Sequence, residues 1–121
     1  MKIKETSTHF ENKSKLNEEC NVIYAINLVK GQWVLMIVCK LSEEGKMRFN
    51  ELKKGIPEIT ERMLTLQLRQ MEENQLITRT VYAEVPPRVE YELTSIGKEL
   101  MPVLRSLDEW GEKYKATIFN E

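Results

Sequence analysis

The chain has 121 residues, of which 41% are hydrophobic and 31% are charged, and its formal net charge at pH 7 is −1. This size allows one compact domain and excludes two, and the near-zero charge excludes a protein that is basic throughout. The longest apolar run covers residues 33–39 and is too short to span a bilayer, so we expect no membrane segment.

The residues available for chemistry disfavour an enzyme. The chain has one histidine, His9, and one aspartate, Asp108, and it contains no metal-ligand spacing, nucleophile motif or phosphate-binding loop. We therefore expect no cofactor and no metal. Cys20 and Cys39 lack the spacing of a disulfide framework, and the polar start of the chain lacks a secretory segment, so a reducing cytoplasm is expected.

The net charge conceals one basic segment. Residues 46–71 carry six basic and three acidic side chains, whereas residues 72–121 carry six basic and ten acidic ones. Random variation of solvated charge is one explanation. The other is a DNA-facing surface on an otherwise acidic protein.

The N-terminal part of the chain predicts a leader and two helices. Residues 1–16 are polar and lack periodicity, so we expect a flexible leader, followed by a single domain over residues 17–121. Asn17 is placed to cap a first helix, whose apolar residues recur at helical spacing up to Gly31. A second helix is expected over about residues 32–42.

The basic segment predicts two helices joined by a tight turn. A short strand at residues 46–48 precedes a short helix that ends near Gly55 and Pro57. Thr60 is then placed to cap a helix that ends near residue 73 or 74. Helical spacing places an apolar row on one side of this helix, formed by Leu64, Leu68 and Met71. The opposite side carries Arg62, Leu66, Arg69 and Glu73.

The remaining residues predict a hairpin and a long helix. Residues 78–84 and 88–93 are rich in strand formers, and residues 85–87, Val-Pro-Pro, form a turn that cannot continue a ladder. Thr94 is placed to cap the last helix, in which Pro102 should cause a kink.

This order predicts a mainly helical α+β fold, a winged helix-turn-helix with flanking N- and C-terminal helices. The residues closely resemble the HxlR family of bacterial winged-helix transcriptional regulators, relatives of the MarR type. The resemblance covers about residues 20–111 and is strongest from Val81 to Tyr91, around the Val-Pro-Pro-Arg tip. Gln75 is a departure, because the family usually has glycine there.

The resemblance implies a homodimer, more often a repressor, that binds double-stranded DNA at an operator with approximate twofold symmetry. Several apolar residues of the flanking helices exceed what one small domain needs. The alternative explanation is that these residues are buried in the chain's own core. The expected dimer residues are Ile23, Ile26, Leu104, Leu107 and Trp110.

The helix after Thr60 is the one expected to enter the major groove. Candidate groove contacts are Thr60, Arg62, Thr65, Leu66 and Arg69. Arg88, at the wing tip, is a candidate for a backbone or minor-groove contact, with an ion pair to Glu84 as its alternative. Candidate phosphate contacts are Arg48, Lys53 and Lys54. A solvated helix face is the alternative for the arginines and lysines.

Cys20 matches a cysteine that senses oxidants or electrophiles in some members of the family. It falls near the third position of a helix that is expected to begin after Asn17, next to two glutamates. A half-buried apolar role is the alternative, and Cys39 is expected in the core. Thiol oxidation or a small effector is thus a candidate signal that controls DNA binding. The alternative function for the whole chain is a winged-helix module that binds another protein and does not bind DNA.

Overall fold

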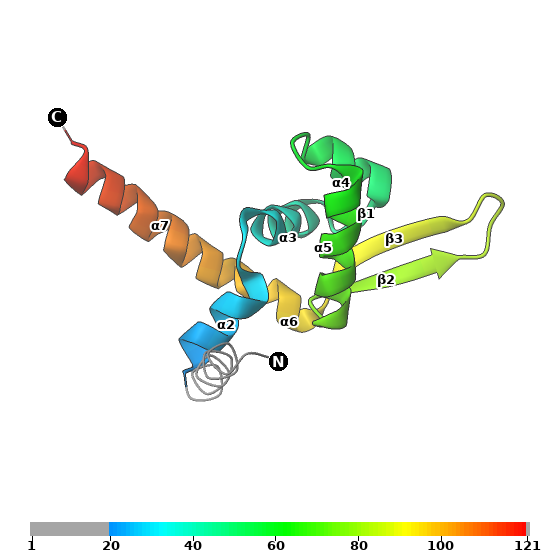
Figure 1. Cartoon of the computed structure of the whole chain (residues 1–121), viewed down its shortest axis with the longest axis horizontal. Coiled ribbons are helices and arrows are strands. Elements are labelled where there is room, and N and C mark those ends of the chain that lie inside the picture. Colours follow the sequence, from blue (N-terminus) through cyan, green and yellow to red (C-terminus); the bar gives the residue numbers. More distant parts are fainter. Residues whose placement is uncertain (1–19, 121) are drawn as a thin grey trace, which may run out of the picture. The chain divides into compact units, whose positions relative to one another are not determined.

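The computed structural model describes residues 20–120, which fall into two units that divide after Gly31 (Figure 1). The first unit contains helix α2 (Asn21–Val29). Cys20 is its N-cap residue with an extended backbone, and the Cys20 carbonyl accepts a hydrogen bond of 3.0 Å from the Tyr24 N–H. Cys20 therefore precedes the helix and does not lie in its first turn. The predicted leader and the predicted Asn17 cap lie outside the described residues.

The second unit is a mainly helical α+β fold, a winged helix-turn-helix, as predicted. The predicted order of elements is confirmed up to the last helix, which is divided in two. In chain order the elements are α3 (Gln32–Glu44), β1 (Lys46–Arg48), α4 (Phe49–Gly55), α5 (Glu61–Glu73), β2 (Ile77–Tyr82), β3 (Arg88–Leu93), α6 (Ser95–Lys98) and α7 (Leu100–Ile118).

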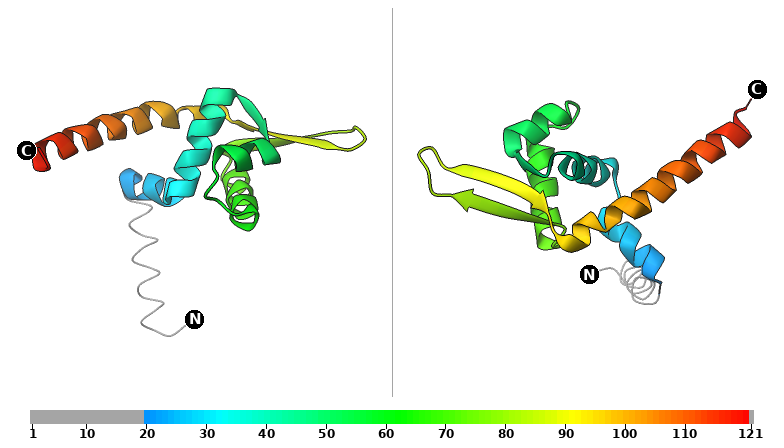
Figure 2. Two further views of the ribbon diagram at one scale, coloured as in Figure 1. Left: turned by 90° about the horizontal axis from the view of Figure 1, so that it is seen from above. Right: turned by 180° about the vertical axis from the view of Figure 1, so that it is seen from behind.

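The three strands form one antiparallel sheet in the order β1-β3-β2. The predicted alternation of β3 is confirmed at Tyr91 and Leu93, which are buried. Their partners across the β2–β3 ladder are Arg79 and Ile77. Beyond these pairs, the hairpin projects away from α5 as the wing (Figure 2).

The core of this unit lies between α3, α4, α5 and the inner end of the sheet. Ile37, Leu52 and Leu64 are fully buried and come from α3, α4 and α5 in turn. The predicted apolar row of α5 is confirmed, because Leu68 and Met71 are also buried. These contacts fix α5 against the sheet and leave the opposite face of α5 free. Cys39, predicted in the core, is only half-buried.

Helix α5 begins and ends with defined caps. Thr60 caps it as predicted, since its Oγ1 accepts a hydrogen bond of 3.0 Å from the Met63 N–H. At the other end Leu76 N–H donates to the Met71 carbonyl and Gln75 N–H to the Glu72 carbonyl, at 2.9 and 3.0 Å. This is the Schellman pattern, which requires a left-handed residue after the helix. Gln75 takes that conformation, with φ 61°.

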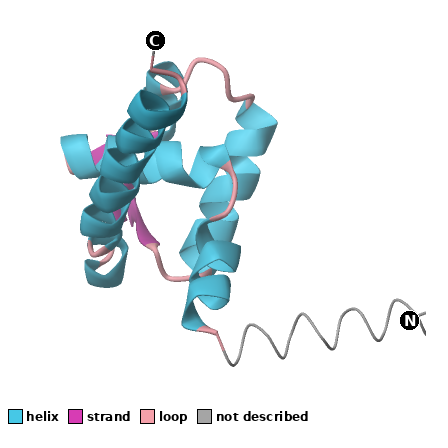
Figure 3. Cartoon of the chain, turned by 90° about the vertical axis from the view of Figure 1, so that its left-hand side faces the viewer, coloured by secondary structure: helices cyan, strands magenta, loops and turns pink. Residues whose placement is uncertain are grey.

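The C-terminal segment, which ends in the long helix that leads to the C label in Figure 3, differs from the predicted single helix. Thr94 caps α6 as predicted, accepting from the Gly97 N–H at 3.0 Å, but α6 ends at Lys98 and α7 starts at Leu100. Pro102 lies in the first turn of α7. Proline cannot donate to the carbonyl four residues earlier and clashes with it, so the break falls before Pro102 and replaces the expected kink.

Among the described residues, no single helix is long and apolar enough to cross a membrane; only α2 and α3 counted together reach the required length and composition.

Candidate nucleic-acid interface

The face of α5 that points away from the core carries the predicted groove residues. Arg62, Leu66 and Arg69 are exposed, and Thr65 is half-buried at the flank. Leu66 is a large apolar side chain that is nevertheless 46% exposed. An exposed leucine between two arginines, on a helix anchored by its other face, suits the apolar and polar edges of a DNA groove.

The start of α5 is an ordered helix terminus. The Thr60 hydroxyl oxygen accepts from the Met63 N–H and so satisfies one of the four N–H groups that the first turn leaves free. The hydroxyl proton of Thr60 remains able to donate, and the side chain is exposed. Thr60 thus both caps the helix and can reach a phosphate oxygen.

The predicted phosphate contacts lie on β1 and α4. Arg48 is exposed, and its backbone N–H donates to Glu51 Oε1 at 2.8 Å, which caps the start of α4. Lys54 is exposed and Lys53 is half-buried. Glu51 therefore has a structural partner in the backbone, and the charges of the three basic side chains are not paired with it.

Arg88 is held by acidic side chains of the wing. Its Nη1 lies 2.9 Å from Glu84 Oε2, and its Nε lies 3.3 Å from Glu90 Oε2 without hydrogen-bond geometry. The guanidinium carbon also lies 4.1 Å from the ring centroid of Tyr82. The side chain of Arg88 is 27% exposed. The ion pair with Glu84, given above as the alternative for Arg88, is therefore present in this structure, and a DNA contact of Arg88 stays a prediction.

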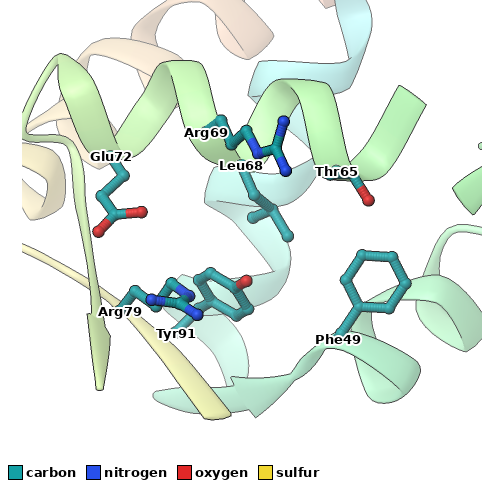
Figure 4. A pocket seen from close by; sticks show the side chains of 7 residues that line it. All are labelled: Phe49, Thr65, Leu68, Arg69, Glu72, Arg79 and Tyr91. Carbon is teal, nitrogen blue, oxygen red and sulfur yellow. The ribbon is translucent and has the colours of Figure 1, made fainter. Parts of the chain in front are cut away.

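A pocket of about 290 Å³ lies between α5 and the wing strands (Figure 4). Its apolar surface comes from Phe49, Leu68 and Tyr91. Arg69 approaches from α5 and Arg79 from β2, on opposite sides of Leu68 and Tyr91, while Glu72 lies at one end. Thr65 also lines this pocket, next to Arg69.

Arg79 was not among the predicted contacts. It follows buried Ile77 by two residues, and the period of a strand places both side chains on the same face of the sheet. It also lies directly across the ladder from Tyr91. Its side chain is nevertheless exposed, because the sheet extends past the core at this point. An arginine on the same strand face as a buried isoleucine is the sequence signal that could have identified it.

The predicted dimer residues are largely solvent-accessible. Leu107 is 58% exposed and Trp110 is 63% exposed, whereas Leu104 is half-buried. On α2, Ile23 and Ile26 are also exposed. Leu107 and Trp110 are thus not buried within the second unit, and the role of all five residues in a dimer stays a prediction.

Comparison with known proteins agrees with this architecture. A family model described as HxlR-like helix-turn-helix matches residues 28–119. The chain belongs to the HxlR-like helix-turn-helix family. It is therefore an HTH-type transcriptional regulator, and the expectation that it is not an enzyme is confirmed by the family.

Individual relatives cover most of the chain. An HTH-type transcriptional regulator of Methanothermobacter thermautotrophicus is 50% identical over 95 residues, which are 78% of this chain and 72% of that protein. The reduced form of the redox regulator HypR has a TM-score of 0.74 and 39% identity, covering 84% of this chain and 99% of HypR. The quinone-bound YodB of B. subtilis has a TM-score of 0.67 and 28% identity, covering 77% of this chain and 97% of YodB.

Proposed function

We propose that this HxlR-like regulator acts as a homodimer that binds a duplex operator of approximate twofold symmetry. The observation that carries the proposal is the free face of α5, which is anchored by Leu64, Leu68 and Met71 and presents Arg62, Leu66 and Arg69 beside the wing. A helix held in this way can enter a major groove, and the wing can reach the adjacent minor groove. We expect the regulator to repress transcription of its target genes.

The proposal of a dimer, with a second copy of the chain, rests on helix α7. Apolar residues at positions 103, 107, 110, 114 and 118 follow one another at spacings of three or four, and all five are exposed. Beyond Leu104, almost every described residue of α7 is exposed. A helical segment as short as the part of α7 beyond Leu104 is only marginally stable in water when nothing packs against it. We therefore expect α7 to have a partner along its apolar stripe. A second α7 supplies a stripe of the same pattern.

Binding to DNA is tested by selection of duplexes from a random library with the reduced protein. An inverted repeat supports a dimer, and its half-site spacing gives the distance between the two α5 helices. The selected duplex is then titrated at several salt concentrations, because phosphate contacts release counterions and make log K fall steeply with log salt. A folded dimer that enriches no duplex, with or without oxidant, contradicts the proposal.

Control by a thiol oxidant or an electrophile is the second part of the proposed function. Cys20 has a free thiol, is half-buried and immediately precedes α2. Two structural relatives are named as a redox regulator and a quinone-bound regulator. Modification of Cys20 changes the packing of α2 and thereby the dimer. The test compares DNA affinity before and after mild oxidation in the wild-type chain and in Cys20→Ser, with Cys39→Ser as the matched control. An unchanged response in Cys20→Ser contradicts this part.

A winged-helix module that binds another protein is the second candidate function. Two features favour it: the chain's net charge of −1, and the pairing of Arg88 with Glu84 and Glu90, which neutralises the basic group nearest the wing tip. The salt titration separates the two functions, since only DNA binding predicts a slope proportional to the number of neutralised phosphates.

A further inference from the structure

We propose that Arg69 and Arg79 form a clamp for a single phosphodiester of the DNA backbone, in the pocket between α5 and the wing. This inference rests on the proposed function. It adds a binding site and a residue, Arg79, that the predicted interface lacks, and it assigns both arginines to one ligand group.

The first argument is the charge in the pocket. Within residues 20–120, neither Arg69 nor Arg79 is in an ion pair, and both guanidinium groups face the same pocket from opposite walls (Figure 4). Both side chains are exposed, so water screens their mutual repulsion, but two cations without a paired anion give this pocket a positive potential. That potential favours binding of an anion. Glu72 lies at one end of the pocket and is not paired with either arginine.

The second argument is a hydroxyl group with no partner. Tyr91 is only 9% exposed, and its hydroxyl points into the pocket. No hydrogen bond to this hydroxyl occurs within the part of the chain that the structure describes. Among the described residues this hydroxyl is not one of the buried groups without a partner, so solvent reaches it in the pocket and it is free to donate to a bound oxygen. A phosphate oxygen could accept from it, and the half-buried Thr65 hydroxyl is a further donor on the opposite wall, where it lies on α5 next to Arg69.

The third argument is the position of the pocket relative to the two DNA grooves. If α5 occupies the major groove and the wing reaches the adjacent minor groove, then the backbone strand that separates these grooves passes between α5 and the wing. The pocket lies there, with Arg69 on the helix and Arg79 on β2. Guanidinium groups bind phosphate in a fork geometry, so two of them on opposite sides can hold one phosphodiester.

The clamp predicts a specific dependence on salt. We measure log K against log salt for the full-length wild type, Arg69→Ala, Arg79→Ala and the double variant on the selected duplex and on a duplex of unrelated sequence. If both arginines share one phosphate, the double variant loses about 0.9 of the slope per protomer, and each single variant loses less than that. The affinity of the double variant falls roughly tenfold or more, equally on both duplexes, since a backbone contact carries no sequence information.

Three further measurements make the test decisive. Arg79→Lys keeps the charge but loses the fork, so its slope should match the wild type while its affinity falls. Arg105→Ala on α7 removes one positive charge outside the pocket and should change slope and affinity little. A duplex with uncharged methylphosphonate at each backbone position in turn should contain one position per half-site that weakens the wild type and has no effect on the double variant.

The outcomes separate the clamp from the function on which it rests. Slope losses of about 0.9 for each single variant and 1.8 for the double variant per protomer would show two independent phosphates and overturn the clamp. A double variant that behaves like Arg105→Ala also overturns it and leaves DNA binding intact. A wild-type dimer that binds no duplex overturns both proposals together.

Discussion

Replacing Gln75 with glycine should stabilise the protein. Gln75 adopts φ 61° to complete the Schellman cap of α5, and a residue with a Cβ pays about 1–2 kcal/mol in the left-handed region. The side chain of Gln75 is exposed, and no hydrogen bond of its amide occurs among the described residues, so its removal costs no packing. Glycine loses more conformational freedom on folding, which offsets about 0.5–1 kcal/mol of the gain.

The net expectation is a gain of about 0.5–1 kcal/mol in the free energy of unfolding. For a chain of this size, this corresponds to a rise in Tm of roughly 2–6 °C. The assay is thermal and urea unfolding followed by circular dichroism, at one fixed protein concentration, because a dimer makes Tm depend on concentration.

Two matched variants test the reasoning. Gln75→Ala keeps the Cβ and should leave the stability within about 0.5 kcal/mol of the wild type. Asn74→Gly lies one residue earlier, where φ is −82°, and should lower the stability by about 0.5–1 kcal/mol, because it gains no relief of strain. The reasoning is refuted if Gln75→Gly is neutral or destabilising, or if Gln75→Ala gives the same gain.

Three other predictions concern packing, assembly and the wing. Gly97→Ala should lower the free energy of unfolding by about 1–3 kcal/mol, because the added Cβ would collide with the backbone carbonyl of Leu76, in the turn between α5 and β2; unchanged urea unfolding would contradict this. Leu107→Glu should convert the dimer to a monomer in analytical ultracentrifugation, and a persistent dimer would exclude the α7 stripe as the interface. Glu84→Gln should leave Glu90 as the one acidic partner of Arg88 among the described residues and tighten DNA binding about two- to fivefold relative to Glu92→Gln, which removes the same charge without touching either ion pair; the difference should vanish when Arg88 is also replaced by alanine.

The order of the elements and the anchoring of α5 followed from the sequence because their causes are local. Helix caps at Thr60 and Thr94, and apolar rows at helical spacing, depend on residues three or four positions apart. The alternation that buries Tyr91 and Leu93 depends on residues two apart. Each of these signals is complete within one element, so no knowledge of its neighbours was needed.

The tertiary structure decided features that depend on residues distant in the chain or on competing local preferences. Gln75 lies in a left-handed conformation because the buried Met71 and Leu76 hold the turn that it completes. Glu84 and Arg88 approach each other only once the hairpin closes. Arg69 and Arg79 face one pocket because the packing of α5 on the sheet brings a helix surface and a strand surface together. The sequence by itself therefore determined the helix-turn-helix with its wing, whereas the pairing of charges on that wing and in the pocket beside it required the packed fold.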